Sequence, residues 1–468
     1  MNFSRKRPAT RLRLVIALGV TTGLAVTGCA SASDSSSGGA ATSAATSAAG
    51  TLPSALVDAA VAAAKTASGG IQFGGEINIL GVTSGDEAKA LTDAMAPFTT
   101  ATGTKINYTG SQDWSTVLAT GIASNNVPDI VDAQGAGTAL TYAKQGLFLP
   151  LNSILGDTLK ANYSQGLLDA VTVNGDTYGI WGETDAFMVW YNTKTYTGPT
   201  KPASYDELNT WATTQAATGV APWCMALEAG PGSGFRAESW VENMFLKMYG
   251  PEKLAAWANG TLPFNSPEVK AAFQRYADVA GSKTMVNGGP QTVVSTSFLN
   301  YTTGMFSSPQ QCQLSLWGNY AVGLTTSTYP NVQVPGDMNF FTVPGATPAA
   351  DTAQNTAGHV LSALKSKDSP TVEAFMKYWA SSDAQSLIAA SGRWSVGNKN
   401  VALASYPNAT MKASADLLNN ASTIVIGPTG TMPTAVVAAW DKANIAIAQD
   451  PSTLDAQLDA IQALVPAN

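Results

Sequence analysis

The feature that most constrains the fold is an alternation of short strands and amphipathic helices between residues 76 and 132. Residues 76–82, 104–109 and 127–132 are predicted strands, and residues 87–99 and 114–124 between them are predicted helices. Strands joined by helices make right-handed crossovers, which place the strands parallel in one sheet with helices on its faces. The chain is therefore predicted to be an α/β protein.

The rest of the chain keeps this mixed character. Further strands are predicted at residues 177–181, 187–191, 320–325 and 339–343, and further helices at residues 205–217, 237–249, 267–280, 370–380, 384–390 and 435–448. About 400 residues of ordered sequence exceed what one hydrophobic core usually supports, so we expect two domains.

The N-terminus has the pattern of a lipoprotein signal peptide, predicted here to span residues 1–28. Basic side chains precede an apolar run at residues 14–26 that is short for a membrane span. The small residues before Cys29 resemble a lipobox, which predicts a diacylglycerol group on Cys29 and a membrane tether. The alternative is an ordinary secretion signal cleaved near Ala30 or Ala32.

The segment after this signal, residues 29–70, is predicted to hold the lipidated Cys, a flexible linker and a short helix. Residues 30–51 are almost entirely Ser, Ala, Gly and Thr, which cannot form a core. An Ala-rich helix is predicted at residues 53–65, and we expect the globular part to begin near Phe73.

Charge, cysteine and histidine content exclude several classes of function. Removing residues 1–28 removes five basic and no acidic side chains, so the formal charge moves from −7 to −12, which argues against nucleic acid as a partner. Cys224 and Cys312 would remain in an oxidising compartment, where a disulfide is the default and a free pair the alternative. The chain has one histidine, His359, for which we expect a structural role where a strand enters a helix. No metal site, cofactor or catalytic activity is expected.

Several motifs occur in an order that resembles a known family. They lie at residues 98–106, 128–130, 146–151, 174–180, 189–192, 222–224, 238–242, 262–267 and 431–440. In this order they resemble the family 1 extracellular solute-binding proteins of ABC importers, the maltose-type group, and most of all its alpha-glucoside-binding members. That resemblance also supports the bond between Cys224 and Cys312.

The resemblance implies a periplasmic-binding-protein-like (type II) fold, with two α/β lobes joined by a hinge and the ligand cleft between them. It places lobe 1 at residues 71–190 and 341–382, and lobe 2 at residues 191–340 and 383–468. It implies a monomer on the extracellular face of the cell membrane that captures a sugar by lobe closure and delivers it to ABC transporter permease subunits.

A neutral sugar needs aromatic platforms for its C–H faces and carboxylates or amides for its hydroxyls. The candidate ligand-binding residues on lobe 1 are Ser84, Asp86, Asp113, Trp114, Gln134, Glu183 and Asp185. Those on lobe 2 are Glu228, Phe235, Trp317, Trp394 and Trp440. The positions of Asp185 and Trp317 are implied by the resemblance. Helix capping is the alternative role for Asp86 and Asp113, and core packing is the alternative for Trp394 and Trp440.

The sequence is also compatible with other functions. Similar alpha-glucoside receptors carry an acidic residue shortly before Met432 and Pro433, and its absence here leaves the sugar undetermined. A receptor for a peptide or polyamine on the same fold is one alternative. A secreted glycoside hydrolase using Glu183 and Asp185 is a second, and an adhesin or structural lipoprotein is a third.

Overall fold

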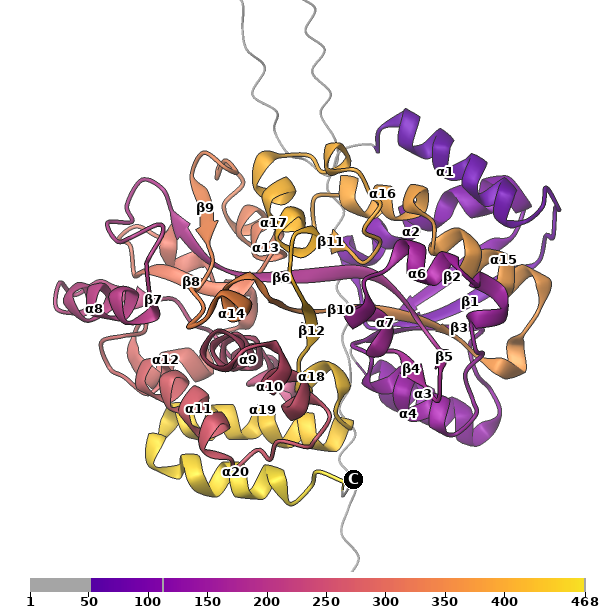
Figure 1. The fold of residues 1–468 in the computed structure, drawn as a ribbon. Coiled ribbons are helices and arrows are strands. Elements are labelled where there is room, and N and C mark those ends of the chain that lie inside the picture. The colour runs from indigo at the N-terminus through magenta and orange to yellow at the C-terminus, as the bar shows by residue number, and fades with distance from the viewer. Residues whose placement is uncertain (1–51, 112, 467–468) are drawn as a thin grey trace, which may run out of the picture. The chain divides into compact units, whose positions relative to one another are not determined.

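The computed structural model describes residues 52–111 and 113–466 (Figure 1). Its largest sheet has the strand order β2-β1-β3-β10-β6-β8-β7. Strands β1 (Glu76–Gly81), β2 (Lys105–Gly110) and β3 (Ile130–Gln134) are parallel, as the alternation of strands and helices predicts. The intervening helices are α2 (Gly85–Thr102) and α3 (Trp114–Ser124).

The sheet continues through two long strands, β6 (Ile180–Asn192) and β10 (Gln354–Ala363). The first half of β6 pairs antiparallel with β10, and the second half pairs with β8 (Cys312–Gly318) and β9 (Met338–Phe341). Figure 1 shows β6 passing from the elements around β8 to those around β10. The two strands predicted at residues 177–181 and 187–191 are thus one strand, because its almost continuous burial gives no alternation from which to read its length.

The remaining elements complete the fold. The other strands are β4 (Thr172–Val173), β5 (Asp176–Thr177), β7 (Ala221–Trp223), β11 (Ser395–Val396) and β12 (Ile424–Ile426). The other helices are α1 (Ser54–Ala67), α4 (Gly137–Lys144), α5 (Asn152–Leu155), α6 (Thr158–Asn162), α7 (Gln165–Asp169), α8 (Tyr205–Ala216), α9 (Phe235–Tyr249), α10 (Pro251–Ala258), α11 (Pro267–Ala280), α12 (Gly289–Ser295), α13 (Ala321–Thr328), α14 (Pro348–Thr352), α15 (Pro370–Trp379), α16 (Ser382–Ala390), α17 (Ala409–Asn419), α18 (Pro428–Thr431), α19 (Thr434–Gln449) and α20 (Leu454–Gln462).

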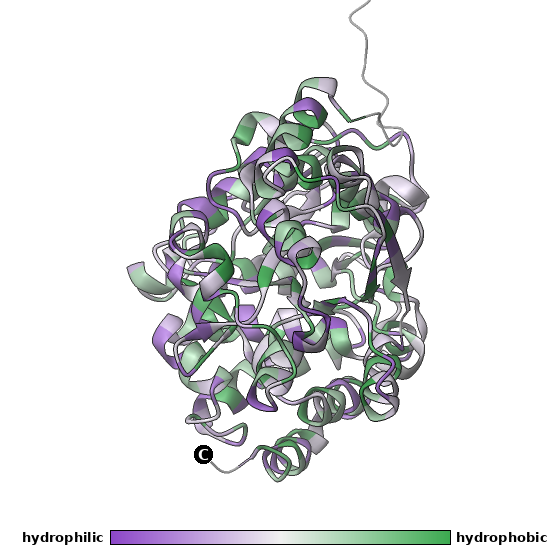
Figure 2. Cartoon of the chain, turned by 90° about the vertical axis from the view of Figure 1, so that its right-hand side faces the viewer, coloured by the Kyte–Doolittle hydropathy of each residue, from purple (hydrophilic) through white to green (hydrophobic). Residues whose placement is uncertain are grey.

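Helix boundaries follow the capping residues closely. Ser204, Ser266 and Ser369 each accept a hydrogen bond from a backbone N–H in the first turn of α8, α11 and α15. Both polar and apolar colours run along single helices in Figure 2, as expected for helices that bury one side. These two signals explain why most of the predicted helices are confirmed within a few residues.

Two local predictions are wrong. Residues 321–325 form the start of α13 and not a strand, because the periodicity of a short apolar run does not distinguish a strand from a helix. His359 lies within β10 and not at a strand-to-helix junction, since the strand continues to Ala363.

Helix α1 belongs to the folded body, so the prediction that the globular part begins near Phe73 is too late. Ala60 and Ala64 have no exposed surface, and α1 packs against α2, α15 and α16. The predicted signal peptide, Cys29 and the linker at residues 30–51 lie outside the described residues.

Helix α16 also packs against α2, an element of the predicted lobe 1. This contact favours a lobe boundary after α16, although the lobe boundaries themselves stay a prediction. The disulfide between Cys224 and Cys312 is present, beside the pairing of β7 with β8. Within the described residues, no helix combines the length and the apolar character needed to cross a membrane.

Candidate functional site

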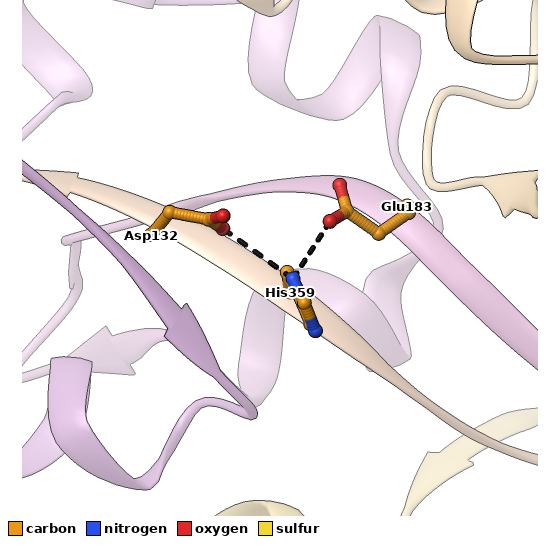
Figure 3. Close-up of side chains that lie close together, drawn as sticks. All are labelled: Asp132, Glu183 and His359. Atoms are coloured by element: carbon orange, nitrogen blue, oxygen red, sulfur yellow. Dashed lines mark ion pairs between the residues drawn. The ribbon is translucent and has the colours of Figure 1, made fainter. Parts of the chain in front are cut away.

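Three ionisable side chains meet on neighbouring strands at the centre of the sheet. Asp132 is on β3, His359 on β10 and Glu183 on β6, and β10 lies between the other two strands. His359 Nδ1 lies 2.7 Å from Glu183 Oε1 and 3.7 Å from Asp132 Oδ1 (Figure 3). The Asp132 and Glu183 side chains are 0% and 1% exposed, and that of His359 is 16% exposed. We call these three residues the central trio.

The backbone beside the central trio is shaped by Gly358. The pairing of β10 with β6 shifts register between Gly358 and Val360, which changes the direction of the side chains. Gly358 has φ +144°, and a Cβ there would lie 2.2 Å from the carbonyl oxygen of Glu183. Glycine therefore permits the close approach of the two strands that bear His359 and Glu183.

The central trio is incompletely paired. Tyr108 Oη donates a hydrogen bond of 2.7 Å to Asp132 Oδ2, and Thr83 Oγ1 lies 3.4 Å from His359 Nδ1. Glu183 Oε1 is paired with His359 Nδ1, while Glu183 Oε2 and Asp132 Oδ1 have no hydrogen-bond partner among the described residues.

Burial and charge act on the central trio in opposite directions. Burial raises the pKa of Glu183, while the His359 imidazolium lowers it. Burial also disfavours the charged form of His359, but the Glu183 and Asp132 carboxylates raise its pKa well above the ordinary value.

Two residues further along β6, Asp185 is electrostatically coupled to Arg236 of α9. Burial raises the pKa of Asp185 to about 7, although the charges on His359 and Arg236 act to lower it. Asp185 Oδ1 and Arg236 Nε find no hydrogen-bond partner in the described part of the chain. A buried acceptor and a buried donor therefore remain available in the same region.

Aromatic rings surround the Arg236 guanidinium. Its Cζ lies 4.0 Å from the Phe235 ring centre, 4.7 Å from that of Tyr320, 5.0 Å from that of Phe298 and 5.5 Å from that of Trp317. Arg236 also donates a 2.8 Å hydrogen bond to Tyr320 Oη. These contacts fix the orientation of the guanidinium.

A pair of carboxyl groups lies near Arg236, one of them two residues after it on α9. Glu238 of α9 interacts with Asp441 of α19, and burial together with the Asp441 carboxylate raises the pKa of Glu238 well above the ordinary value. Burial raises the pKa of Asp441 to about 6. Glu238 Oε1 and Asp441 Oδ1 have no hydrogen-bond partner within the described residues. The pair thus adds further acceptor capacity near Arg236, whose charge lowers the pKa of Glu238.

The predicted residues on the turns after β1, β2 and β3 are mostly exposed. Ser84 is the residue before α2 and makes no side-chain capping bond, and Asp86 is 85% exposed, 3.8 Å from Arg393. Asp113 precedes α3, also without a side-chain capping bond. Trp114 is 8% exposed and Gln134 is exposed. Their ligand role stays a prediction.

The predicted residues of lobe 2 divide into two groups. Phe235 and Trp317 contact Arg236, as described above. Glu228 uses Oε1 to accept a hydrogen bond from the backbone of Gly230, and Trp394 is 5% exposed. The ligand role of these four residues also stays a prediction.

Trp440 and Trp317, both predicted to stack on sugar, are buried in this structure, and their ligand role stays a prediction. Trp440 has no exposed surface, and its ring packs among those of Trp257, Phe264 and Phe273 in the core. Trp317 also has no exposed surface, and it stacks on Tyr301 at 4.7 Å. Neither ring has a free face in this structure.

Sequence reasoning missed Arg236, Tyr320, Glu238, Asp441 and the contacts of His359. The glycine-rich loop at residues 230–236 is the signal that points to Arg236, since it leads directly into α9. The approach of Asp441 to Glu238 depends on the packing of α19 against α9 and has no local signature.

A large pocket lies away from the predicted ligand residues. It has a volume of about 1350 Å³ and is bordered by residues of α4, α7, α10, α17 and β12, among them Lys144 and Asp169, and by Asn259 and Thr423. None of the predicted ligand residues lines it, and within the described residues its lining contains no Trp, Tyr or Phe. It therefore lacks the aromatic platform that favours a sugar.

Comparison with known proteins identifies binding proteins. Residues 82–386 match the family of bacterial extracellular solute-binding proteins. The osmoprotective compounds-binding protein GgtB of Synechocystis sp. is 28% identical over 365 residues, which cover 77% of this chain and 85% of that protein. The alpha-glucosides-binding periplasmic protein AglE of Rhizobium meliloti is 26% identical over 371 residues, which cover 77% of this chain and 80% of that protein.

A solved structure shows the same fold. A chitin oligosaccharide binding protein matches with a TM-score of 0.69 at 19% identity, covering 83% of this chain and 98% of that one. The predicted type II periplasmic-binding-protein fold is thereby confirmed. With a sequence match across residues 82–386 and this fold, the chain belongs to the family of bacterial extracellular solute-binding proteins.

Proposed function

We propose that this protein captures a neutral sugar, a glucoside or short oligosaccharide, outside the cell and delivers it to the permease of an ABC importer. The observation that carries this proposal is the surroundings of Arg236. A fixed guanidinium with an unpartnered Nε, held by aromatic rings, lies near the unpartnered Asp185 Oδ1 in the described structure. Sugar hydroxyls both donate and accept, so one ligand can pair with both groups.

The relatives support a sugar as the ligand class. Two similar proteins are named for binding alpha-glucosides and chitin oligosaccharide, and a third is named for binding osmoprotective compounds. The buried carboxyl groups of Asp185, Glu238 and Asp441 suit a ligand rich in hydroxyl donors. A polar group left unpaired in such a site costs about 1–3 kcal/mol, which makes a missing hydroxyl detectable.

Membrane tethering and delivery complete the proposal. The lipobox-like sequence before Cys29 supports a diacylglycerol anchor on the outer face of the cell membrane. The protein is a monomer whose two lobes close around the sugar, and permease subunits recognise the closed form; membership of the solute-binding family supports this part of the proposal. Labelling with radioactive palmitate, lost in Cys29→Ser, tests the anchor.

The first experiment is a thermal-shift screen of the purified protein against mono-, di- and oligosaccharides. A ligand present at a hundredfold its Kd stabilises the folded state by about 2.7 kcal/mol, which raises Tm measurably. Arg236→Met should weaken binding of the sugar by about 10–100-fold, because one charged donor is lost. The matched control is Arg275→Met, since Arg275 packs over the Tyr205 ring at 4.2 Å on a different helix, α11.

The same screen distinguishes the other candidate functions. A shift with peptides or polyamines and none with sugars would retain the binding-protein family and reject the sugar. Release of nitrophenol from nitrophenyl glycosides, lost in Glu183→Gln, would indicate a glycoside hydrolase. If Arg236→Met and Arg275→Met weaken sugar binding equally, Arg236 is not part of the sugar-binding site.

A further inference from the structure

The central trio has a donor set that suits a metal ion. It offers one imidazole nitrogen and carboxylate oxygens from two residues, and the donor atoms lie within 4.8 Å of one another. Zinc binds such nitrogen and oxygen atoms at about 2.0–2.2 Å, so two ligand atoms in a tetrahedral site lie roughly 3.4 Å apart. His359 Nδ1 is closer than this to Glu183 Oε1, at 2.7 Å, and slightly farther from Asp132 Oδ1, at 3.7 Å, so the donors would have to rearrange by up to about an ångström, through side-chain rotation.

The carboxylate oxygens of the central trio are not all paired, which also favours a bound cation. Glu183 Oε1 is paired with His359, but Glu183 Oε2 and Asp132 Oδ1 lack hydrogen-bond partners among the described residues, although these side chains are 1% and 0% exposed. Buried carboxylate oxygens without partners are costly. The two carboxylates bring two negative charges, whereas His359 can bring only one positive charge. A divalent cation bound to a neutral imidazole would balance both.

The residues around the central trio hold it in a suitable orientation. Tyr108 Oη binds Asp132 Oδ2 and leaves Oδ1 free to face His359. A Cβ at Gly81 would lie 2.1 Å from Tyr108 Oη and 2.9 Å from Asp132 Oδ2, so glycine makes room for this contact. Hydrogen bonds of this kind to a coordinating carboxylate orient it for metal binding.

We propose that Asp132, Glu183 and His359 bind a divalent transition-metal ion of the zinc class, with His359 Nδ1 and one oxygen of each carboxylate as ligands. The mixed nitrogen and oxygen donors favour zinc over calcium or magnesium, which prefer sites made entirely of oxygen. The partial exposure of His359 provides the side from which the ion enters. Neither Arg236 nor Asp185 is among the proposed metal ligands, although Asp185 interacts electrostatically with Glu183 and His359.

The test uses Zn²⁺ itself and protein purified without a histidine tag. After incubation with Zn²⁺ and dialysis, mass spectrometry of the metal content should find about one ion per chain. Zn²⁺ should raise Tm, and EDTA should reverse the rise. Asp132→Asn, Glu183→Gln and His359→Gln should each lose the bound ion, whereas Glu373→Gln on α15 should retain it.

A conservative variant distinguishes loss of metal binding from loss of folding. Tyr108→Phe keeps all three ligands, and it should weaken Zn²⁺ binding by about 10–100-fold while leaving Tm in EDTA close to that of the parent. The proposal would be overturned if the parent protein bound much less than one Zn²⁺ per chain and its Tm did not change on addition of Zn²⁺. Equal Zn²⁺ binding by Glu183→Gln and the parent would also overturn it. A sugar-dependent shift measured in EDTA tests the proposed function independently of the metal.

Discussion

Asp441, on α19, lies beside Glu238 of α9, and burial raises its pKa to about 6. In the unfolded chain an aspartate has a pKa near 3.9. Between about pH 4 and pH 6 the folded state therefore binds more protons than the unfolded state, and stability falls as the pH rises through this window.

We expect Asp441→Asn to remove the part of this dependence that comes from Asp441, while Glu238, whose pKa burial also raises, keeps its own contribution. At pH 7 the variant should be more stable than the parent by about 2 kcal/mol, because it no longer buries a charge, and the difference should disappear below about pH 4. Thermal unfolding between pH 4 and pH 7.5 measures this. Asp58→Asn, at an exposed position of α1, is the control and should follow the parent throughout. A constant difference at every pH would contradict the assignment to Asp441 ionisation.

Gly358 lies at a close contact between β10 and β6 that leaves no room for a side chain. Its φ of +144° and the 2.2 Å approach of an added Cβ to the Glu183 carbonyl oxygen make any side chain unfavourable. Gly358→Ala should lower the free energy of unfolding by about 2–4 kcal/mol in urea titrations. Gly232→Ala should be nearly neutral, because no atom lies within 4 Å of an added Cβ there. Equal effects of both variants would show that the strand contact is not tight.

At the scale of secondary-structure elements, α1 has the least expected position. Its sequence predicts only a short helix after a linker, yet it covers α2, α15 and α16 with a face of small residues. Ala60 and Ala64 lie on that face, where larger side chains would separate the helices. The helix thus forms part of the core and does not serve as a spacer.

A matched pair of substitutions tests this packing. Ala64→Asp places a carboxylate at a fully buried position and should lower the free energy of unfolding by about 3 kcal/mol. Ala62→Asp, on the exposed side of the same helix, should change it by less than about 0.5 kcal/mol. Urea unfolding measures both. Similar stabilities would mean that α1 does not pack against the fold in solution.

At the scale of the whole molecule, the disulfide joins segments 88 residues apart in sequence. Closing a loop of this length restricts the unfolded chain, so the Cys224→Ala/Cys312→Ala double variant should be less stable by about 2–4 kcal/mol. Comparing its urea midpoint with that of the oxidised parent measures the effect. Because Cys224 and Cys312 are almost fully buried, the loss should appear without a change in the sugar-dependent thermal shift.

The elements that were predicted well are those with local signals at both ends. Helix α11 begins after the capping residue Ser266 and ends before Gly281, and its predicted bounds match the structure. Strand β6 was harder to predict, because a strand buried on both faces shows no alternation. Glu183 and Asp185 lie between the two strands predicted there, the position of Asp185 was implied by the family resemblance, and the ligand role of both stays a prediction. Arg236 and Asp441 were not found, because helix packing brings them to the site.

The sequence by itself determined the family, the α/β class, most helix boundaries and the cysteine pair, since each depends on short-range patterns or on motifs kept in order along the chain. The tertiary structure decided which polar groups meet. His359 contacts Glu183 because β10 lies between β3 and β6 with a register shift after Gly358. Trp440 is in the core because α19 packs against α9 and α11. Contacts between distant segments depend on strand order and helix packing, and no local pattern encodes them.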